Sequence, residues 1–108
     1  MSEGPVEFSV ESKSEEDRLT LCVSGYVDWE SAQKLRDHLY QCQIKKTVVI
    51  DLTNVCSVTS GGLAILIDIH STLSIRGSTL EIRNPTPTVY NVFRIAHLED
   101  FLHVQQGE

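Results

Sequence analysis

Ser60, which stands beside the paired glycines Gly61 and Gly62, is the first candidate in this sequence for chemistry. A catalytic serine needs a base and an orienting acid, and many serine hydrolases present it in a G-x-S-x-G turn. The sequence has no such turn, and its spacing assigns neither a base nor an acid to Ser60. Hydrolase activity is weakly supported, and we expect no catalytic residue.

The four histidines and three cysteines do not predict a metal site. No histidine belongs to an H-E-x-x-H pattern, and the cysteines include no C-x-x-C pair. His70 is expected at the core or its edge, and the cysteines are expected as small buried hydrophobic residues. A Walker A loop and a G-x-G-x-x-G loop are also missing, so a nucleotide has no glycine-rich cradle. We therefore expect neither a metal nor a cofactor.

The sequence places Ser60 at the start of a helix, which allows two interpretations. Its hydroxyl could cap the helix by accepting a hydrogen bond from a free amide, worth about 1 kcal/mol. Gly61 and Gly62 are unfavourable in a helix that needs only a cap, and close approach by another backbone would explain them. A phosphoryl group on Ser60 would lie in the favourable field of the helix N-terminus and add about 1.5 to 2 negative charges. Phosphorylation of Ser60 is therefore a physically reasonable regulatory switch. The added negative charge would repel an acidic partner and would hardly disturb the fold.

The elements that position Ser60 alternate along the chain. Period-two patterns and β-branched runs predict strands at residues 6–10, 19–24, 47–52, 79–83 and 101–104. Charged residues 11–17 are expected as a hairpin connection, and residues 53–59 as a loop. Helical spacing predicts helices at 29–42, 61–76 and from Pro87 to about residue 96, with caps at Asp28 and Thr86. The order ββαβαβαβ predicts an α/β fold, with a mixed, mainly parallel sheet and helices packed against it.

The second predicted helix is unusually apolar. Its expected buried stripe consists of Leu63, Leu66, Ile67 and His70. Ile65 and Ile69 lie off this stripe, and one buried face cannot cover all of these side chains. We therefore expect Ile65 and Ile69 to contribute to an exposed surface for a protein partner.

Length and charge exclude several classes of protein. The 108 residues suit a single domain, and 15 acidic against 9 basic residues give a net charge of −6. This charge has the wrong sign for neutralising phosphates, so nucleic-acid binding is not expected. The longest aliphatic run, Leu63 to Ile67, is far below the ~20 residues that cross a bilayer, so we expect no membrane insertion. The N-terminus lacks the pattern of a secretory signal, and a cytoplasmic location is expected.

Three stretches of the chain together carry a family resemblance. A hydrophobic strand ends in Asp51-Leu52, and Thr59-Ser60-Gly61-Gly62 then opens the apolar helix. The other two stretches are Gly25-Tyr26-Val27-Asp28 and Pro87-Thr88-Val89, the latter followed by Phe93 and Leu98. From about Val6 to Val104 the chain resembles the STAS domain family, named for sulfate transporters and anti-sigma factor antagonists. In that family, Asp-Ser-Ser-Gly or a variant opens the corresponding helix.

The resemblance implies a bacterial regulatory protein without catalytic activity. An antagonist of this kind binds an anti-sigma factor that is also a serine kinase, which frees the sigma factor for transcription. The kinase then phosphorylates the serine of the motif, which corresponds to Ser60, and a phosphatase is a further candidate partner. Asp28 and Asp51 match acidic positions near that serine, whereas Thr59 departs from the usual aspartate. The expected partner-binding residues are Asp28, Thr59, Ser60, Gly61, Gly62, Ile65 and Ile69.

A second function is compatible with the same fold. The run from Ser60 to Ala64 also looks like the Thr-Gly-Gly-Leu-Ala of the small STAS subunit that binds the ATPase of a phospholipid-transporting ABC complex. In that setting the hydroxyl would be a structural or docking group. A third possibility, a small-ligand sensor, would need an apolar pocket with convergent polar groups, which the sequence does not identify.

Overall fold

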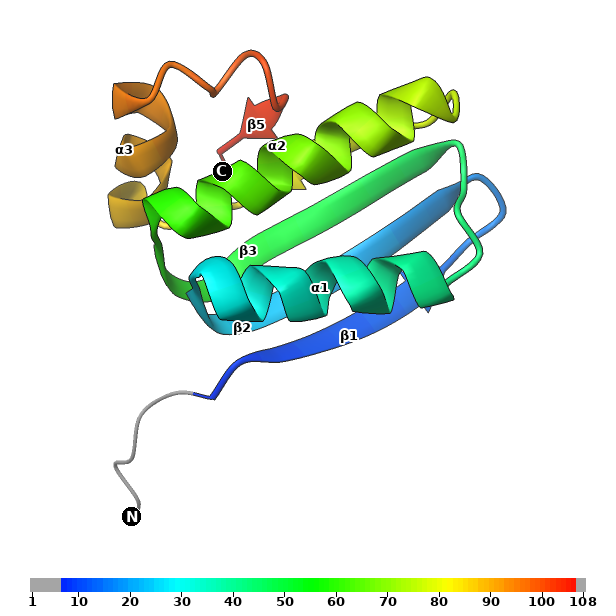
Figure 1. Cartoon of the computed structure of the whole chain (residues 1–108), viewed down its shortest axis with the longest axis horizontal. Helices are drawn as coiled ribbons and strands as arrows, with labels where there is room; N and C mark the ends of the chain where they lie inside the picture. The colour runs from blue at the N-terminus through cyan, green and yellow to red at the C-terminus, as the bar shows by residue number, and fades with distance from the viewer. Residues whose placement is uncertain (1–6, 107–108) are drawn as a thin grey trace.

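The protein forms a five-stranded sheet with helices α1 and α2 lying side by side on one face (Figure 1). The computed structural model describes residues 7–106. The elements are β1 (Ser9–Ser14), β2 (Arg18–Val27), α1 (Trp29–Gln41), β3 (Thr47–Val58), α2 (Ser60–Ile75), β4 (Thr79–Arg83), α3 (Pro87–Ile95) and β5 (Val104–Gln105). The strand order is β1-β2-β3-β4-β5, with β1 antiparallel and the other pairs parallel. The predicted α/β fold and its element order are confirmed.

The first hairpin lies further along the chain than the sequence indicated. Strand β1 begins at Ser9 and continues to Ser14, and so includes residues 11–14 of the stretch expected as a connection. Its antiparallel register pairs Ser9 with Ser24 and Ser14 with Leu19. An edge strand is held by backbone hydrogen bonds and tolerates exposed charged side chains, so it needs no apolar alternation. Residue 6 of the predicted strand lies outside the described residues.

Strands β2 and β3 are both longer than predicted, and this determines the geometry of the site. The expected loop at residues 53–59 is mostly strand, because β3 continues to Val58. Strand β2 likewise continues to Val27, with Gly25 opposite Val55 and Val27 opposite Val58. Two register shifts interrupt the pairing, and such bulges break the period-two pattern by which strands are identified in sequence. The two strands therefore end side by side.

The buried face of helix α2 is wider than the single stripe that the sequence predicted. Its buried residues are Gly62, Leu63, Ile65, Leu66, Ile69 and Leu73. Ile65 and Ile69 are only 3% and 0% exposed, so the prediction that they contribute to an exposed surface for a partner is wrong. Because α2 packs against both the sheet and α1, its buried face is wide and includes positions off the predicted stripe. Ile67 and His70, expected in the buried stripe, are half-buried instead.

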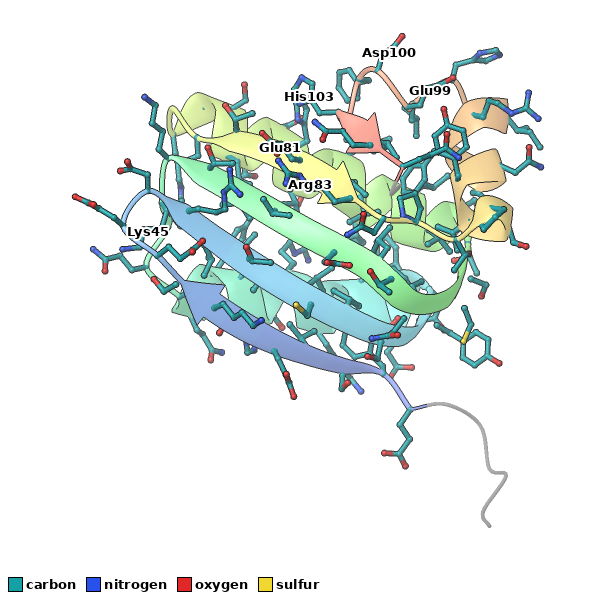
Figure 2. The ribbon with its side chains drawn as sticks, turned by 180° about the vertical axis from the view of Figure 1, so that it is seen from behind. Lys45, Glu81, Arg83, Glu99, Asp100 and His103 are labelled. Carbon is teal, nitrogen blue, oxygen red and sulfur yellow. The ribbon has the colours of Figure 1, made fainter. Side chains whose placement is uncertain are left out.

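The face of the sheet opposite α1 and α2 carries polar side chains (Figure 2). On β4, Leu80 and Ile82 are buried, whereas Glu81 and Arg83 lie on this opposite face and form an ion pair of 2.6 Å. The core therefore lies between the sheet and its helices. Within residues 7–106, no helix has the length and apolar character needed to cross a membrane.

Candidate functional site

Helices α1 and α2 begin next to each other, at the carboxyl ends of two neighbouring parallel strands (Figure 1). Val27 and Val58 are register partners and the last residues of β2 and β3, so Asp28 and Thr59 follow them directly. The amide of Thr59 donates a hydrogen bond of 3.0 Å to the carbonyl of Val27. This bond fixes the two strand-to-helix junctions against each other, and the site consists of these junctions and the first turns of both helices.

Asp28 caps α1, as the sequence predicted. Its carboxylate accepts a hydrogen bond of 2.9 Å from the amide of Ser31, while the Ser31 hydroxyl accepts one of 2.9 Å from the Asp28 amide. The bond from the Ser31 amide, followed by that from its hydroxyl, holds the pKa of Asp28 below the ordinary value of 3.8. Asp28 therefore presents a fixed negative charge at the surface beside Ser60.

Thr59, not Ser60, caps α2. The Thr59 hydroxyl accepts a hydrogen bond of 3.2 Å from the Gly62 amide, and Ser60 is the first residue of the helix. The capping interpretation of Ser60 is therefore wrong, because β3 runs to Val58 and leaves Thr59 in the extended conformation that a cap requires. Within residues 7–106 the exposed Ser60 hydroxyl makes no hydrogen bond. It is available for modification or for contact with another molecule.

The two glycines accommodate this chain's own backbone. A Cβ at Gly62 would lie 2.4 Å from the Val27 carbonyl oxygen, and a Cβ at Gly61 would lie 3.0 Å from the Cβ of Trp29. The expected close approach of a backbone is therefore real, but it is intramolecular. Gly62 is buried under Val27, which contradicts its prediction as a partner contact. Gly61 is half-buried beside Trp29.

Asp51 is remote from this site, although the resemblance implied that it would be near. It lies seven residues before Val58, which corresponds to roughly 23 Å of strand. Its carboxylate accepts hydrogen bonds from the Thr53 amide and hydroxyl, at 2.9 and 2.6 Å, and from the Asn84 side chain, at 3.2 Å. Asp51 therefore stabilises the local backbone between β3 and the end of β4.

Two exposed aromatic residues of the site were missed by the sequence analysis. Trp29, the first residue of α1, is 56% exposed, and Tyr26, near the end of β2, is 47% exposed. The signal available for Trp29 was its place directly after Asp28, the predicted cap of the helix. Of the predicted partner-binding residues, Asp28, Thr59 and Ser60 are exposed in one cluster with Trp29.

Away from the helix starts, two arginine side chains connect α1 and α2. Arg36 of α1 forms an ion pair of 2.8 Å with Asp68 of α2. The guanidinium carbon of Arg76, at the end of α2, lies 5.5 Å from the ring centre of Tyr40 of α1. Across residues 7–106, no group of three or more histidine, cysteine or acidic side chains is arranged to hold a metal ion. The arrangement can present a hydroxyl, a carboxylate and an indole to another macromolecule.

Comparison with known families agrees with this geometry. The family model described as "Mlab, STAS domain" matches residues 9–104. The chain belongs to the STAS domain family. The match includes both strand-to-helix junctions and the whole of α1, α2 and α3.

Several individual proteins resemble this STAS domain over most of its length. The anti-sigma-B factor antagonist of Listeria monocytogenes is 29% identical over 104 residues, which cover 94% of this chain and 91% of the relative. The crystal structure of a putative anti-sigma factor antagonist from Thermotoga maritima has a TM-score of 0.81 at 17% identity, covering 91% of this chain and 86% of that one. The structure of the Bacillus cell fate determinant SpoIIAA in its phosphorylated form has a TM-score of 0.69 at 15% identity, covering 94% of this chain and 92% of that one. The two solved structures establish the likeness of fold.

Proposed function

We propose that this STAS domain is an anti-sigma factor antagonist that binds an anti-sigma factor serine kinase and is released when Ser60 is phosphorylated. The observation that carries the proposal is the exposed hydroxyl of Ser60 at the first position of α2, which makes no hydrogen bond within residues 7–106. The Listeria relative is named as an anti-sigma-B factor antagonist, which supports the antagonist role. The Bacillus protein of similar fold occurs in a phosphorylated form, which supports phosphorylation as the switch.

The transfer itself needs only ATP and the kinase in addition to Ser60. The Ser60 oxygen attacks the γ-phosphorus of ATP, the bond from that phosphorus to the β–γ bridging oxygen breaks, and ADP leaves. A base on the kinase takes the hydroxyl proton. The departure at Thr59 leaves the fold intact, because threonine caps a helix as aspartate does. It removes one carboxylate next to Ser60, and Asp28 remains as the nearby acidic group.

Phosphorylation at Ser60 would act on binding more than on stability. The phosphate would lie at the N-terminus of α2, where the helix dipole favours negative charge by about 0.3 to 1 kcal/mol. For transfer to occur, the nucleotide phosphates must approach Ser60, so a phosphate already present there would repel them. The modified domain therefore keeps its fold and loses its partner.

The proposal is tested by affinity purification from the native host, with mass spectrometry of the partners and of Ser60, followed by calorimetry with the purified kinase. We expect the unmodified domain to bind, Ser60→Asp to bind at least about tenfold more weakly, and Ser60→Ala to bind without accepting phosphate. Ser71→Asp is the matched control, because Ser71 is also an exposed serine of α2 but lies about 16 Å further along it. Full affinity of Ser60→Asp would contradict the charge mechanism, and phosphate on Ser60→Ala would show a different acceptor.

A second candidate function has specific support in the description of the matching family model, which names Mlab. The run from Ser60 to Ala64 resembles the motif of the STAS subunit that binds an ABC transporter ATPase. In that role Ser60 would dock without being modified. Co-purification with an ABC ATPase and its permease, with Ser60 unmodified, would favour this function over the antagonist.

A further inference from the structure

Trp29 is the largest exposed apolar side chain beside Ser60. It is 56% exposed, and it is the single tryptophan of the chain. A Cβ placed on Gly61 would lie 3.0 Å from the Cβ of Trp29 and 3.3 Å from its amide nitrogen. The base of the indole side chain therefore lies against the first turn of α2, next to Ser60.

The surroundings of Trp29 differ from the rest of the surface where α1 meets α2. Further along, the charges of the half-buried Arg36 and the exposed Asp68 neutralise each other. Around Trp29 the flanking charges are the exposed carboxylates of Asp28 and Glu30. This end of the helix pair thus combines a large apolar side chain with two negative charges.

We propose that Trp29 is the principal anchor of the partner interface, inserting into an apolar pocket of the anti-sigma factor kinase whose rim carries lysine or arginine side chains that face Asp28 and Glu30. This inference rests on the function proposed above. Tryptophan is enriched among the few interface residues that supply most of the binding energy, because it buries a large rigid surface at little cost in conformational entropy. Opposite charges around such a residue orient the partner and speed association.

The position of Trp29 also explains how one phosphate can end the complex. A pocket that closes over Trp29 must also remove water from the adjacent Ser60. Asp28 and Glu30 already pair with the basic side chains of the rim, so a phosphate on Ser60 would lose its hydration without a counter-charge of its own, which is strongly unfavourable. Modification at Ser60 therefore prevents burial of the indole.

The experiment uses the recombinant anti-sigma factor serine kinase of the source organism and the full chain, with binding measured by calorimetry. We expect Trp29→Ala to weaken binding at least about thirtyfold and Trp29→Phe to have an intermediate effect. Ile75→Ala is the matched control, because Ile75 is 87% exposed at the opposite end of α2, about 22 Å from Ser60, and should bind as the wild type does. Thermal unfolding of each variant establishes that it is folded.

A second measurement uses the unsubstituted chain, so it does not depend on how a variant folds. Labelling with 5-fluorotryptophan gives one fluorine resonance from the chain, and kinase binding should shift it and abolish its response to the change from H₂O to D₂O. If Trp29→Ala binds the kinase as tightly as the wild type while Ser60→Asp binds more weakly, Trp29 is not the anchor and the proposed function stands. If Trp29→Ala binds more weakly while Ser60→Asp keeps its full affinity, the role of Trp29 is supported and phosphorylation of Ser60 as the switch is contradicted. No binding by the wild type would overturn both proposals.

Discussion

At the scale of single residues, the site depends on hydrogen bonds that each side chain can make with the backbone next to it. Asp28 and Thr59 both use a side-chain oxygen to satisfy an amide in the first turn of the following helix. Ser60 is then left with no such task, which frees its hydroxyl. Asp28 remains exposed and charged, so the bond that starts α1 also gives the site its local negative potential.

The lowered pKa of Asp28 predicts a pH dependence of stability. A carboxyl group whose pKa is lower in the folded state stabilises the fold above its unfolded pKa, ordinarily 3.8, and this contribution is lost as the pH falls through the folded value. Asp28→Asn can still accept the Ser31 amide bond but carries no charge. We expect the wild type to exceed Asp28→Asn in unfolding free energy above pH 4, and this difference to shrink as the pH falls further. Urea unfolding across pH 2 to 7 measures it, and a difference that stays constant would contradict the assignment.

At the scale of elements, the close packing of α2 against the junction of β2 and α1 explains the glycine pair. Gly62 lies against the carbonyl of Val27, a backbone group that cannot move without disturbing the sheet. Gly61 lies against the Cβ of Trp29, at the exposed start of α1. The two positions therefore differ in how much a small side chain would disturb them.

Alanine substitutions should separate the roles of the two glycines. Gly62→Ala places a Cβ 2.4 Å from the Val27 oxygen, so the backbone must shift, and we expect a loss of about 2 to 3 kcal/mol of unfolding free energy. At Gly61 the contact of 3.0 Å is less severe and alanine favours the helix, so Gly61→Ala should change stability by less than about 1 kcal/mol. Chemical denaturation compares the two directly. Equal effects would mean that the contact with the Val27 carbonyl does not limit the size of residue 62.

At the scale of the whole molecule, one core between the sheet and the helices supports the surface that we propose for binding. Most large apolar residues of α2 point into this core, and apart from Ile75 near its end the exposed side of the helix is polar or small, with Ser60, Ala64, Asp68 and Ser71. The partner surface proposed above therefore lies at the end where α1 and α2 begin, where Trp29 and Tyr26 are exposed, and not along an aliphatic face of α2.

This division predicts different effects for two isoleucines of the same helix. Ile69 is 0% exposed, so Ile69→Ala should leave a cavity and cost about 2 to 5 kcal/mol of unfolding free energy. Ile75 is 87% exposed, and Ile75→Ala should change stability by less than about 0.5 kcal/mol. Thermal and urea unfolding of both variants provide the measurement. A small effect at Ile69 would mean that α2 is rotated relative to the orientation described above.

The sequence by itself determined the features that depend on neighbouring residues along the chain. Helical spacing located all three helices. Asp28 was predicted correctly as the cap of α1, and the Thr86-Pro87 pair as the start of α3. The alternation of strands and helices was sufficient for the α/β fold, because crossover connections bring successive strands into one parallel sheet. The place of Ser60 at the start of the second helix followed from the same local signals.

Only the tertiary structure decided which atoms meet at that junction. Thr59 becomes the cap because hydrogen bonds to β2 extend β3 as far as Val58. The sequence does not show this extension, because a bulge interrupts the period-two pattern by which a strand is predicted. Ile65 and Ile69 are buried because α2 contacts both the sheet and α1, whereas a helical pattern specifies only the spacing of its apolar residues. The contact of Gly61 with Trp29 joins the first turns of two helices through residues that are 32 positions apart in the chain, so no local pattern could reveal it.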